Sequence, residues 1–235
     1  MSQMKVFGSS CRAASHLRLN TPGQRDLDLP TRKLPKSSCQ WDAIFLDLGD
    51  VVFKWSTEST VQPGAALKSI MKSDSYARYE IGQIETEDEF SSIIGQDLGL
   101  DSDFVRTTFQ AARKSLEAND ELVGFIQELK RTTGISVYAM SNIPRSDADY
   151  LSREHPSTMS VFDRVFASGA HGSRKPDPPF YRMVLADSQL VPERTIFVDD
   201  KIQNVDAARN LGMRGLHFES TNALCDNLRG LFTLE

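Results

Sequence analysis

Short apolar runs that end abruptly in polar residues are the feature of this sequence that most limits its possible folds. Residues 43–48 form the first run, with Asp47 near its end and Gly49 closing it. The same design recurs in residues 135–140, 164–167 and 195–198. Runs of this length, bounded by turn-forming or polar residues, are typical of buried parallel strands.

Segments with helical spacing of apolar residues separate these runs. They cover residues 121–131, 178–187 and 203–211, and a last short run at 215–218 precedes a terminal helix. Strands that alternate with helices in this way predict an α/β fold, a doubly wound parallel sheet of the Rossmann-like kind.

A long stretch without a comparable strand lies between the first run and the helix at 121. Residues 64–72, 86–98 and 102–116 show helical spacing within it, and Asp101 or Ser102 is a suitable cap for the last of these. We therefore expect a small α-helical cap at residues 57–117. The α/β core is then made of residues 41–56 and 118–235.

The first 40 residues contain several prolines and no apolar stretch of the kind that a secretory signal needs, which predicts a disordered N-terminal tail over 1–40. Basic residues and serines without an acid leave an organelle leader within residues 1–25 as the less favoured alternative to a cytoplasmic location. The 3 cysteines are odd in number and lack metal-ligand spacing, which favours a reducing compartment over a disulfide framework.

Composition restricts the possible partners. No apolar run approaches the roughly 18 residues of a membrane span, so we expect none. A net charge of -5 and a pI near 5.5 provide no broad basic face for nucleic acid. A small phosphorylated metabolite remains compatible, because a local positive site can exist inside an acidic protein. The oligomeric state is left open.

Polar residues at the ends of the predicted strands form a candidate site. Asp47, Ser141 and the pair Asp199-Asp200 stand at such ends, and Lys175 lies in a loop just before a helix. Ligands of open parallel sheets bind beyond the carboxyl ends of the strands, so we expect these side chains to face one crevice.

The residue types suit phosphoryl transfer. A carboxylate can attack phosphorus, while a hydroxyl, a lysine and a cation balance the charge of the transition state. Magnesium takes hard oxygen ligands and keeps several waters, so we expect Mg²⁺ between Asp47, Asp200 and the backbone carbonyl of Gly49.

Each of these segments has a simpler explanation when taken alone. Asp47 could end a strand in a turn, Ser141-Asn142 could cap a helix, Lys175 could be solvated, and Asp199-Asp200 could cap the next helix. All of these explanations would have to hold at once, and we reject that coincidence.

The motifs together resemble the haloacid dehalogenase superfamily, in the subgroup with a helical cap between its first and second motifs. The resemblance covers residues 41–235 and rests on these segments: Leu46-Asp47-Leu48-Gly49-Asp50-Val51, Met140-Ser141-Asn142, Arg174-Lys175-Pro176-Asp177-Pro178 and Phe197-Val198-Asp199-Asp200. It implies a Mg²⁺-dependent phosphatase that acts on a small phosphate ester through an aspartyl-phosphate intermediate.

The resemblance also implies roles for individual residues. Asp47 is the expected nucleophile, and Ser141 and Lys175 are expected to hold the phosphoryl oxygens, with Asn142 as a further substrate contact. The expected metal ligands are Asp47, Gly49, Asp200 and Asp199, the last of which supports the metal or orients its water.

One position departs from the family pattern. Its phosphatases usually carry a second aspartate two residues after the nucleophile, where it protonates the leaving group; Gly49 stands there in this chain. Loss of a general acid and base typically lowers the rate about 10² to 10⁴-fold. Asp50 is not expected to substitute, because its offset of three from Asp47 implies a different side-chain direction.

Two alternative functions stay open. The residues Phe53-Lys54-Trp55-Ser56 and the cap segment 79–84 look like fungal members of terpenoid pathways, so the chain could be a prenyl-diphosphate phosphatase or a terpene cyclase of that superfamily. Gly49 instead motivates a non-catalytic binding protein that retains the fold. Cap residues that could line a substrate mouth are Tyr76, Tyr79, Glu80 and Gln83.

Overall fold

The computed structural model describes residues 40–55 and 65–233. Residues 1–39 of the predicted tail, which include the predicted leader, lie outside these ranges, as do residue 56 of the predicted core and residues 57–64 of the predicted cap. Of the cysteines, Cys225 is described, and it is buried with a free thiol. No helix in the described ranges combines the length and the apolar composition that crossing a bilayer would need.

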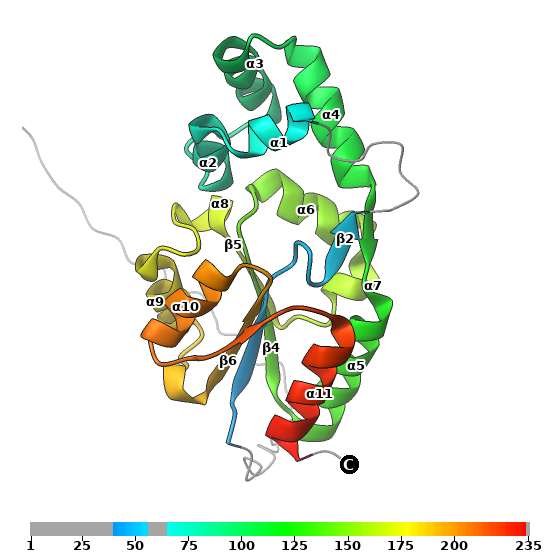
Figure 1. Cartoon of the computed structure of the whole chain (residues 1–235), viewed down its shortest axis with the longest axis vertical. Coiled ribbons are helices and arrows are strands. Elements are labelled where there is room, and N and C mark those ends of the chain that lie inside the picture. Colours follow the sequence, from blue (N-terminus) through cyan, green and yellow to red (C-terminus); the bar gives the residue numbers. More distant parts are fainter. Residues whose placement is uncertain (1–39, 56–64, 234–235) are drawn as a thin grey trace, which may run out of the picture. The chain divides into compact units, whose positions relative to one another are not determined.

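A sheet of five parallel strands forms the centre of the fold, in the order β5-β4-β1-β6-β7 (Figure 1). The strands are β1 (Ala43–Leu46), β4 (Ser136–Ser141), β5 (Arg164–Ala167), β6 (Thr195–Asp199) and β7 (Arg214–His217). The predicted doubly wound parallel sheet is confirmed. The chain winds in one direction through β4 and β5 and in the other through β6 and β7, so the crevice is expected beyond β1.

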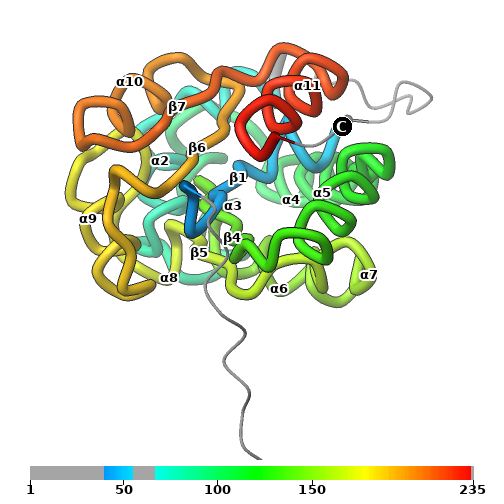
Figure 2. The backbone as a smooth tube through the Cα atoms, turned by 90° about the horizontal axis from the view of Figure 1, so that it is seen from below, coloured from blue at the N-terminus to red at the C-terminus, as the bar shows by residue number. Residues whose placement is uncertain are grey.

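Helices cover both faces of this sheet (Figure 2). On one face lie α5 (Asp120–Thr133) and α11 (Thr221–Phe232), and on the other lie α9 (Pro178–Asp187) and α10 (Ile202–Asn210). The connections contain α6 (Arg145–Glu154), α7 (Pro156–Met159), α8 (Ser168–His171) and the short 3-10 helix η1 (Pro192–Arg194).

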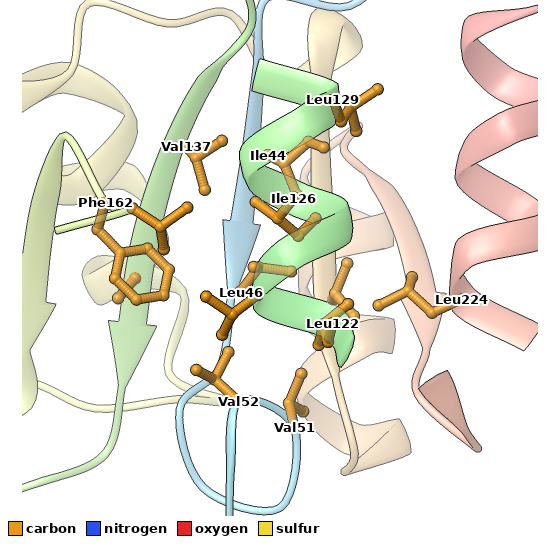
Figure 3. Close-up of a cluster of buried hydrophobic side chains, with 14 of the residues drawn as sticks. Ile44, Leu46, Val51, Val52, Leu122, Ile126, Leu129, Val137, Phe162 and Leu224 are labelled. Atoms are coloured by element: carbon orange, nitrogen blue, oxygen red, sulfur yellow. The ribbon is translucent and has the colours of Figure 1, made fainter. Parts of the chain in front are cut away.

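Strand β1 supplies apolar side chains to both layers. Ile44 and Leu46 pack with α5 and α11, as Figure 3 shows, while Phe45 packs in the opposite layer with α9. Successive strand residues point to opposite faces, and both faces here are covered, so the run is apolar throughout. This burial holds the end of β1, and with it residue 47, in a fixed position.

Four helices lie between β1 and α5 in the described part of the chain: α1 (Ala65–Met71), α2 (Asp74–Glu80), α3 (Glu87–Leu98) and α4 (Ser102–Lys114). They have an apolar cluster of their own, centred on Phe90. The side chains of Thr86 and Asp101 cap α3 and α4 by accepting backbone N–H groups. The predicted helical cap is confirmed as a structural feature, whereas its limits at 57 and 117 stay a prediction.

This stretch contributes no strand to the central sheet, but the sequence pattern did not reveal two short strands at its ends. Strands β2 (Phe53–Trp55) and β3 (Leu116–Ala118) form an antiparallel ribbon that joins the two ends of the cap. Each strand has only three residues, and the two strands are far apart in sequence. No local sequence pattern therefore predicts that they pair. The ribbon brings both cap connections to one place beside the core.

Candidate active site

Asp47 lies directly beyond the end of β1. Its backbone N–H donates to the carbonyl of Val198 in β6 at 2.9 Å, and its side chain is 8% exposed. The Leu48 N–H donates to Asp47 Oδ1 at 2.7 Å. These contacts hold a carboxylate at the carboxyl end of the central strand, where the winding of the sheet reverses.

Lys175 is buried against this carboxylate. Its Nζ lies 2.9 Å from Asp47 Oδ1 and 2.6 Å from Asp199 Oδ2, and it donates to the Met140 carbonyl at 2.7 Å. All three ammonium protons therefore have acceptors, which come from the ends of β1, β4 and β6. Burial acts to lower the pKa of Lys175, but the charges of Asp47 and Asp199 raise it above its ordinary value.

Asn142 holds the loop that carries this lysine. Its Oδ1 accepts the Lys175 N–H, and its Nδ2 donates to the Lys175 carbonyl, both at 2.8 Å. The amide thus serves both backbone groups of one residue. Asn142 also lines the cavity described below, and its predicted substrate contact stays a prediction.

The two acids after β6 have different environments. Asp199 is fully buried, and its Oδ1 accepts from the Lys201 N–H and from Asn204 Nδ2, each at 2.9 Å. Asp200 Oδ1 is buried and has no hydrogen-bond partner among the described residues. Burial raises the pKa of Asp200 to about 6, opposed by Lys201 and reinforced by Asp47 and other acids nearby.

The acids fit a divalent cation. Oxygens of Asp47, Asp199 and Asp200 lie within 4.8 Å of one another. Oxygens on opposite corners of a magnesium octahedron are about 4 Å apart, so a small shift would let them share one ion. The unpartnered oxygen of Asp200 is the donor that such a site needs. Gly49, the other predicted ligand, lines a cavity together with Asp47.

A cavity of about 150 Å³ extends from Asp47 towards the cap. Its polar end includes Asp47, Ser141 and Lys175, together with Lys201. The wall opposite is mostly apolar and comes largely from the cap, from Leu67, Met71, Tyr76, Phe109, Ala112 and Leu116. Of the predicted site residues, Asp47, Gly49, Ser141, Asn142 and Lys175 line this opening, which has an apolar side. Asp199 and Asp200 do not line it, but their carboxylates lie close to that of Asp47.

Family membership follows from comparison with known proteins. A family model for haloacid dehalogenase-like hydrolases matches residues 41–212. This chain is a haloacid dehalogenase-like hydrolase. The predicted superfamily and the predicted hydrolase class are confirmed.

Two fungal relatives of this haloacid dehalogenase-like hydrolase align with most of the chain. The sesquiterpene phosphatase astK of Aspergillus oryzae is 37% identical over 190 residues, which are 80% of this chain and 95% of that protein. The drimenol cyclase drtB of Aspergillus calidoustus is 36% identical over 193 residues, which are 81% of this chain but 36% of that protein. The resemblance to fungal proteins of terpenoid pathways is confirmed.

Solved structures share the fold. A predicted hydrolase of the family from Porphyromonas gingivalis has a TM-score of 0.64 and 24% identity, with 81% of this chain and 99% of that chain covered. A family enzyme from Bacteroides thetaiotaomicron, solved with magnesium and inorganic phosphate, has a TM-score of 0.61 and 19% identity, with 75% and 93% covered. At these identities the likeness establishes the fold alone.

The cap of this haloacid dehalogenase-like hydrolase is fastened to the core by polar contacts. Arg113 of α4 lies 2.5 Å from Glu87 Oε2 in the cap and 2.9 Å from Asp147 Oδ1 of α6 in the core. The Tyr79 hydroxyl is 2.8 Å from Ser146 Oγ. These contacts set the apolar wall of the cavity opposite the acids.

Several cavity residues had no signal in the sequence. Arg113, Asp147 and Lys201 all line the cavity, yet each belongs to an ordinary amphipathic helix or helix start. Of the cap residues considered from the sequence, Tyr76 and Glu80 line the cavity, whereas Tyr79 contacts the core beside it. Only the docking of the cap decides this difference.

Proposed function

We propose that this chain is a magnesium-dependent phosphatase that releases phosphate from an ester of an apolar, prenyl-type alcohol, through an aspartyl-phosphate on Asp47. One observation carries the proposal: a single cavity connects the buried Asp47–Lys175 pair to an apolar wall of the cap. A substrate with an anionic head and an apolar tail matches both ends. The sesquiterpene phosphatase relative, which the chain matches over nearly its whole length, supports the same substrate class.

The proposed roles follow the chemistry of the side chains. Lys175 and the Ser141 hydroxyl bind the phosphoryl oxygens, and Asp200, Asp199 and the Gly49 carbonyl join Asp47 as oxygen donors for Mg²⁺. When bound, the ion neutralises part of the phosphate charge, so that an anionic nucleophile can approach. Asp199 also pairs with Lys175 and thereby holds its ammonium group beside Asp47.

Two displacements complete the proposed reaction. An oxygen of Asp47 forms a bond to phosphorus while the bond to the ester oxygen breaks, and the electron pair leaves with that oxygen. Water then attacks the same phosphorus, and the electron pair of the broken bond returns to Asp47. Splitting hydrolysis in this way replaces one difficult step with two easier ones.

A cyclase is the second candidate, because the drimenol cyclase relative is nearly as similar. The phosphatase is favoured, since the chain spans 95% of the phosphatase but only 36% of the cyclase. A non-catalytic binding protein is the third candidate. Its only support is that Gly49 replaces the usual general acid.

Incubation with farnesyl monophosphate and farnesyl diphosphate, with and without magnesium, separates these candidates. We expect magnesium-dependent release of phosphate and free alcohol, and we expect Asp47→Asn to abolish it while the variant still folds. A cyclic product would favour the cyclase. Binding without any turnover would leave the non-catalytic protein, and release that persists in Asp47→Asn would overturn the proposed nucleophile.

A further inference from the structure

A carboxylate of the cap faces the candidate active site. Glu80 is the last residue of α2, is 6% exposed, and lines the same cavity as Asp47. Its carbonyl accepts the Ser168 hydroxyl of α8 at 2.5 Å, which ties this end of α2 to the core. The hydrogen bond from Ser168 to the Glu80 backbone therefore keeps the Glu80 side chain at the cavity.

Charged and polar groups from several elements surround Glu80. Arg174 Nη1 lies 2.6 Å from its Oε2 in a close ion pair rather than a directed hydrogen bond, and Tyr76 of α2 hydrogen-bonds to it. The charges of Lys201 and Asp47 also act on it. Arg174 directly precedes Lys175 in the same loop. That loop therefore carries both the lysine beside Asp47 and the arginine that pairs with Glu80.

Burial gives Glu80 the acidity of a proton carrier. It raises the pKa to about 7, although Arg174 and Lys201 act to lower it. A group with this pKa populates both protonation states near neutral pH, which suits it to give and take a proton in one cycle.

The family position for such a group is empty in this chain. Gly49 has no side chain to protonate a leaving group, and two other acids line the cavity besides the metal candidates and Glu80, among the described residues. Asp147 is ion-paired with Arg113, and Asp50 is exposed in a turn with a φ of 58°. Both Asp147 and Glu80 have an arginine partner, and burial raises the pKa of Asp147 as well, to about 6. Glu80 is the most buried of the three, since the Asp147 side chain is 25% exposed and Asp50 is exposed.

We propose that Glu80 is the general acid and base of the reaction, and that it acts from the cap in place of the acid missing at position 49. In the first displacement its carboxylic proton passes to the departing ester oxygen, which leaves as the alcohol, and Glu80 becomes a carboxylate. In the second, that carboxylate takes a proton from the attacking water. This inference rests on the proposed function.

Glu80→Gln tests the proposal through two leaving groups. In octyl phosphate the alkoxide needs a proton, whereas in 4-nitrophenyl phosphate the acidic phenol does not. With saturating magnesium, we expect the first turnover of octyl phosphate to slow about 10² to 10⁴-fold. The first turnover of the nitrophenyl ester should change less than about threefold, and should be followed by slow turnover, because the second displacement lacks its base. The nitrophenolate should thus appear as a burst of one equivalent per enzyme.

Controls separate chemistry from structure. Asp50→Asn and Asp147→Asn test the other two acids of the cavity, and Glu89→Gln makes the same carboxylate-to-amide change on the exposed face of α3. Glu80→Asp should recover part of the octyl phosphate rate. A merely structural role of Glu80 would slow both esters equally without a burst, and a leaving-group effect in Asp50→Asn or Asp147→Asn instead would also overturn the proposal.

The two proposals can fail separately. If the wild-type protein hydrolyses both esters and Asp47→Asn hydrolyses neither, the proposed function stands, and the Glu80 result alone decides the inference. If the wild-type protein releases no phosphate from any ester, the proposed function fails first. Thermal unfolding of each variant checks that it is folded.

Discussion

Lys175 is the residue whose environment most depends on the rest of the fold. A fully buried ammonium group is costly unless it is paired and hydrogen-bonded, and here two carboxylates and one carbonyl surround it. The compensation works in both directions, since Asp47 and Asp199 are buried too. Removing the Lys175 ammonium group would leave the carboxylates of Asp47 and Asp199 near each other in a medium that solvates them poorly.

We expect Lys175→Met to destabilise the protein by about 3 to 5 kcal/mol at pH 7, because breaking a buried ion pair leaves uncompensated charge. Urea unfolding measures the loss. Lys130→Met is the matched control, since Lys130 pairs with Asp163 at 2.7 Å but is 30% exposed. Its loss should stay near 1 kcal/mol or below. Equal losses in the two variants would contradict the importance given to burial.

Glu80 should make stability depend on pH in a defined window. Its pKa is about 7 when folded, against 4.5 as a reference, so the unfolded chain releases its proton first as pH rises. The stability that Glu80 contributes is therefore fully present below about pH 4.5 and lost by about pH 7, a change of roughly 3 kcal/mol at about 1.4 kcal/mol per unit. Glu80→Gln lacks this loss, so its stability relative to wild type should improve between pH 5 and pH 8 in urea titrations. A difference that is constant with pH would refute this.

At the scale of elements, the contact between α2 and α8 positions the cap. Gly82 ends the turn after α2 with a φ of 75°, and a Cβ placed there would lie 2.4 Å from the Gly169 carbonyl oxygen. A Cβ placed on Gly169 would in turn lie 2.6 Å from the Arg145 backbone nitrogen and 2.8 Å from Pro144 Cα. The two glycines let the end of α2, and Glu80 with it, approach the backbone beyond β4 and β5.

We expect Gly82→Ala to force α2 away from the core, with a loss of about 2 to 3 kcal/mol from positive φ and close contact combined. Phosphate release should fall with it. Gly99→Ala is the control, because Gly99 has a φ of 65° but nothing within 4 Å of a Cβ. It should lose only about 1 kcal/mol and keep its activity. Thermal unfolding and activity assays compare the two, and a similar activity loss in both would argue against the role of the contact.

At the scale of the whole molecule, the strands of the core and the helices of the cap each contribute one side of the site. The acids cluster at the ends of β1 and β6, and the apolar wall comes from α1, α2 and α4. A cation bound among the acids would therefore stabilise the core directly, and would act on the cap only through the cavity.

Magnesium should raise the unfolding temperature. At about 100 times its dissociation constant, a ligand of the folded state adds about 2.7 kcal/mol, or roughly 5 to 10 °C for a domain of this size. Differential scanning calorimetry with magnesium or EDTA measures the shift. Asp200→Asn should lose most of it, whereas Asp206→Asn on the exposed side of α10 should keep it. An unchanged shift in Asp200→Asn would exclude that carboxylate as a ligand.

The parts of the fold that depend on local patterns could be predicted from the sequence. The segment predicted as a helix at 178–187 is α9 itself, because two prolines at its start and the apolar spacing after them are local signals. The strand ends carrying Asp47, Ser141 and Asp199 were likewise predictable, since a buried strand needs a continuous apolar run and the run ends where the polar residues begin.

The sequence by itself determined the parallel core, the helical cap and the family, because each follows from short-range periodicity or from motifs in a fixed order. Only the tertiary structure decided that Phe53–Trp55 pairs with Leu116–Ala118, and that Glu80 and Arg113 face the acids. An amphipathic helix shows which of its sides is apolar, but not which neighbour that side meets. The close packing at Gly82 and the pairing of β2 with β3 decide which neighbour each cap helix meets. Neither contact can be recognised from the residues next to it in the sequence.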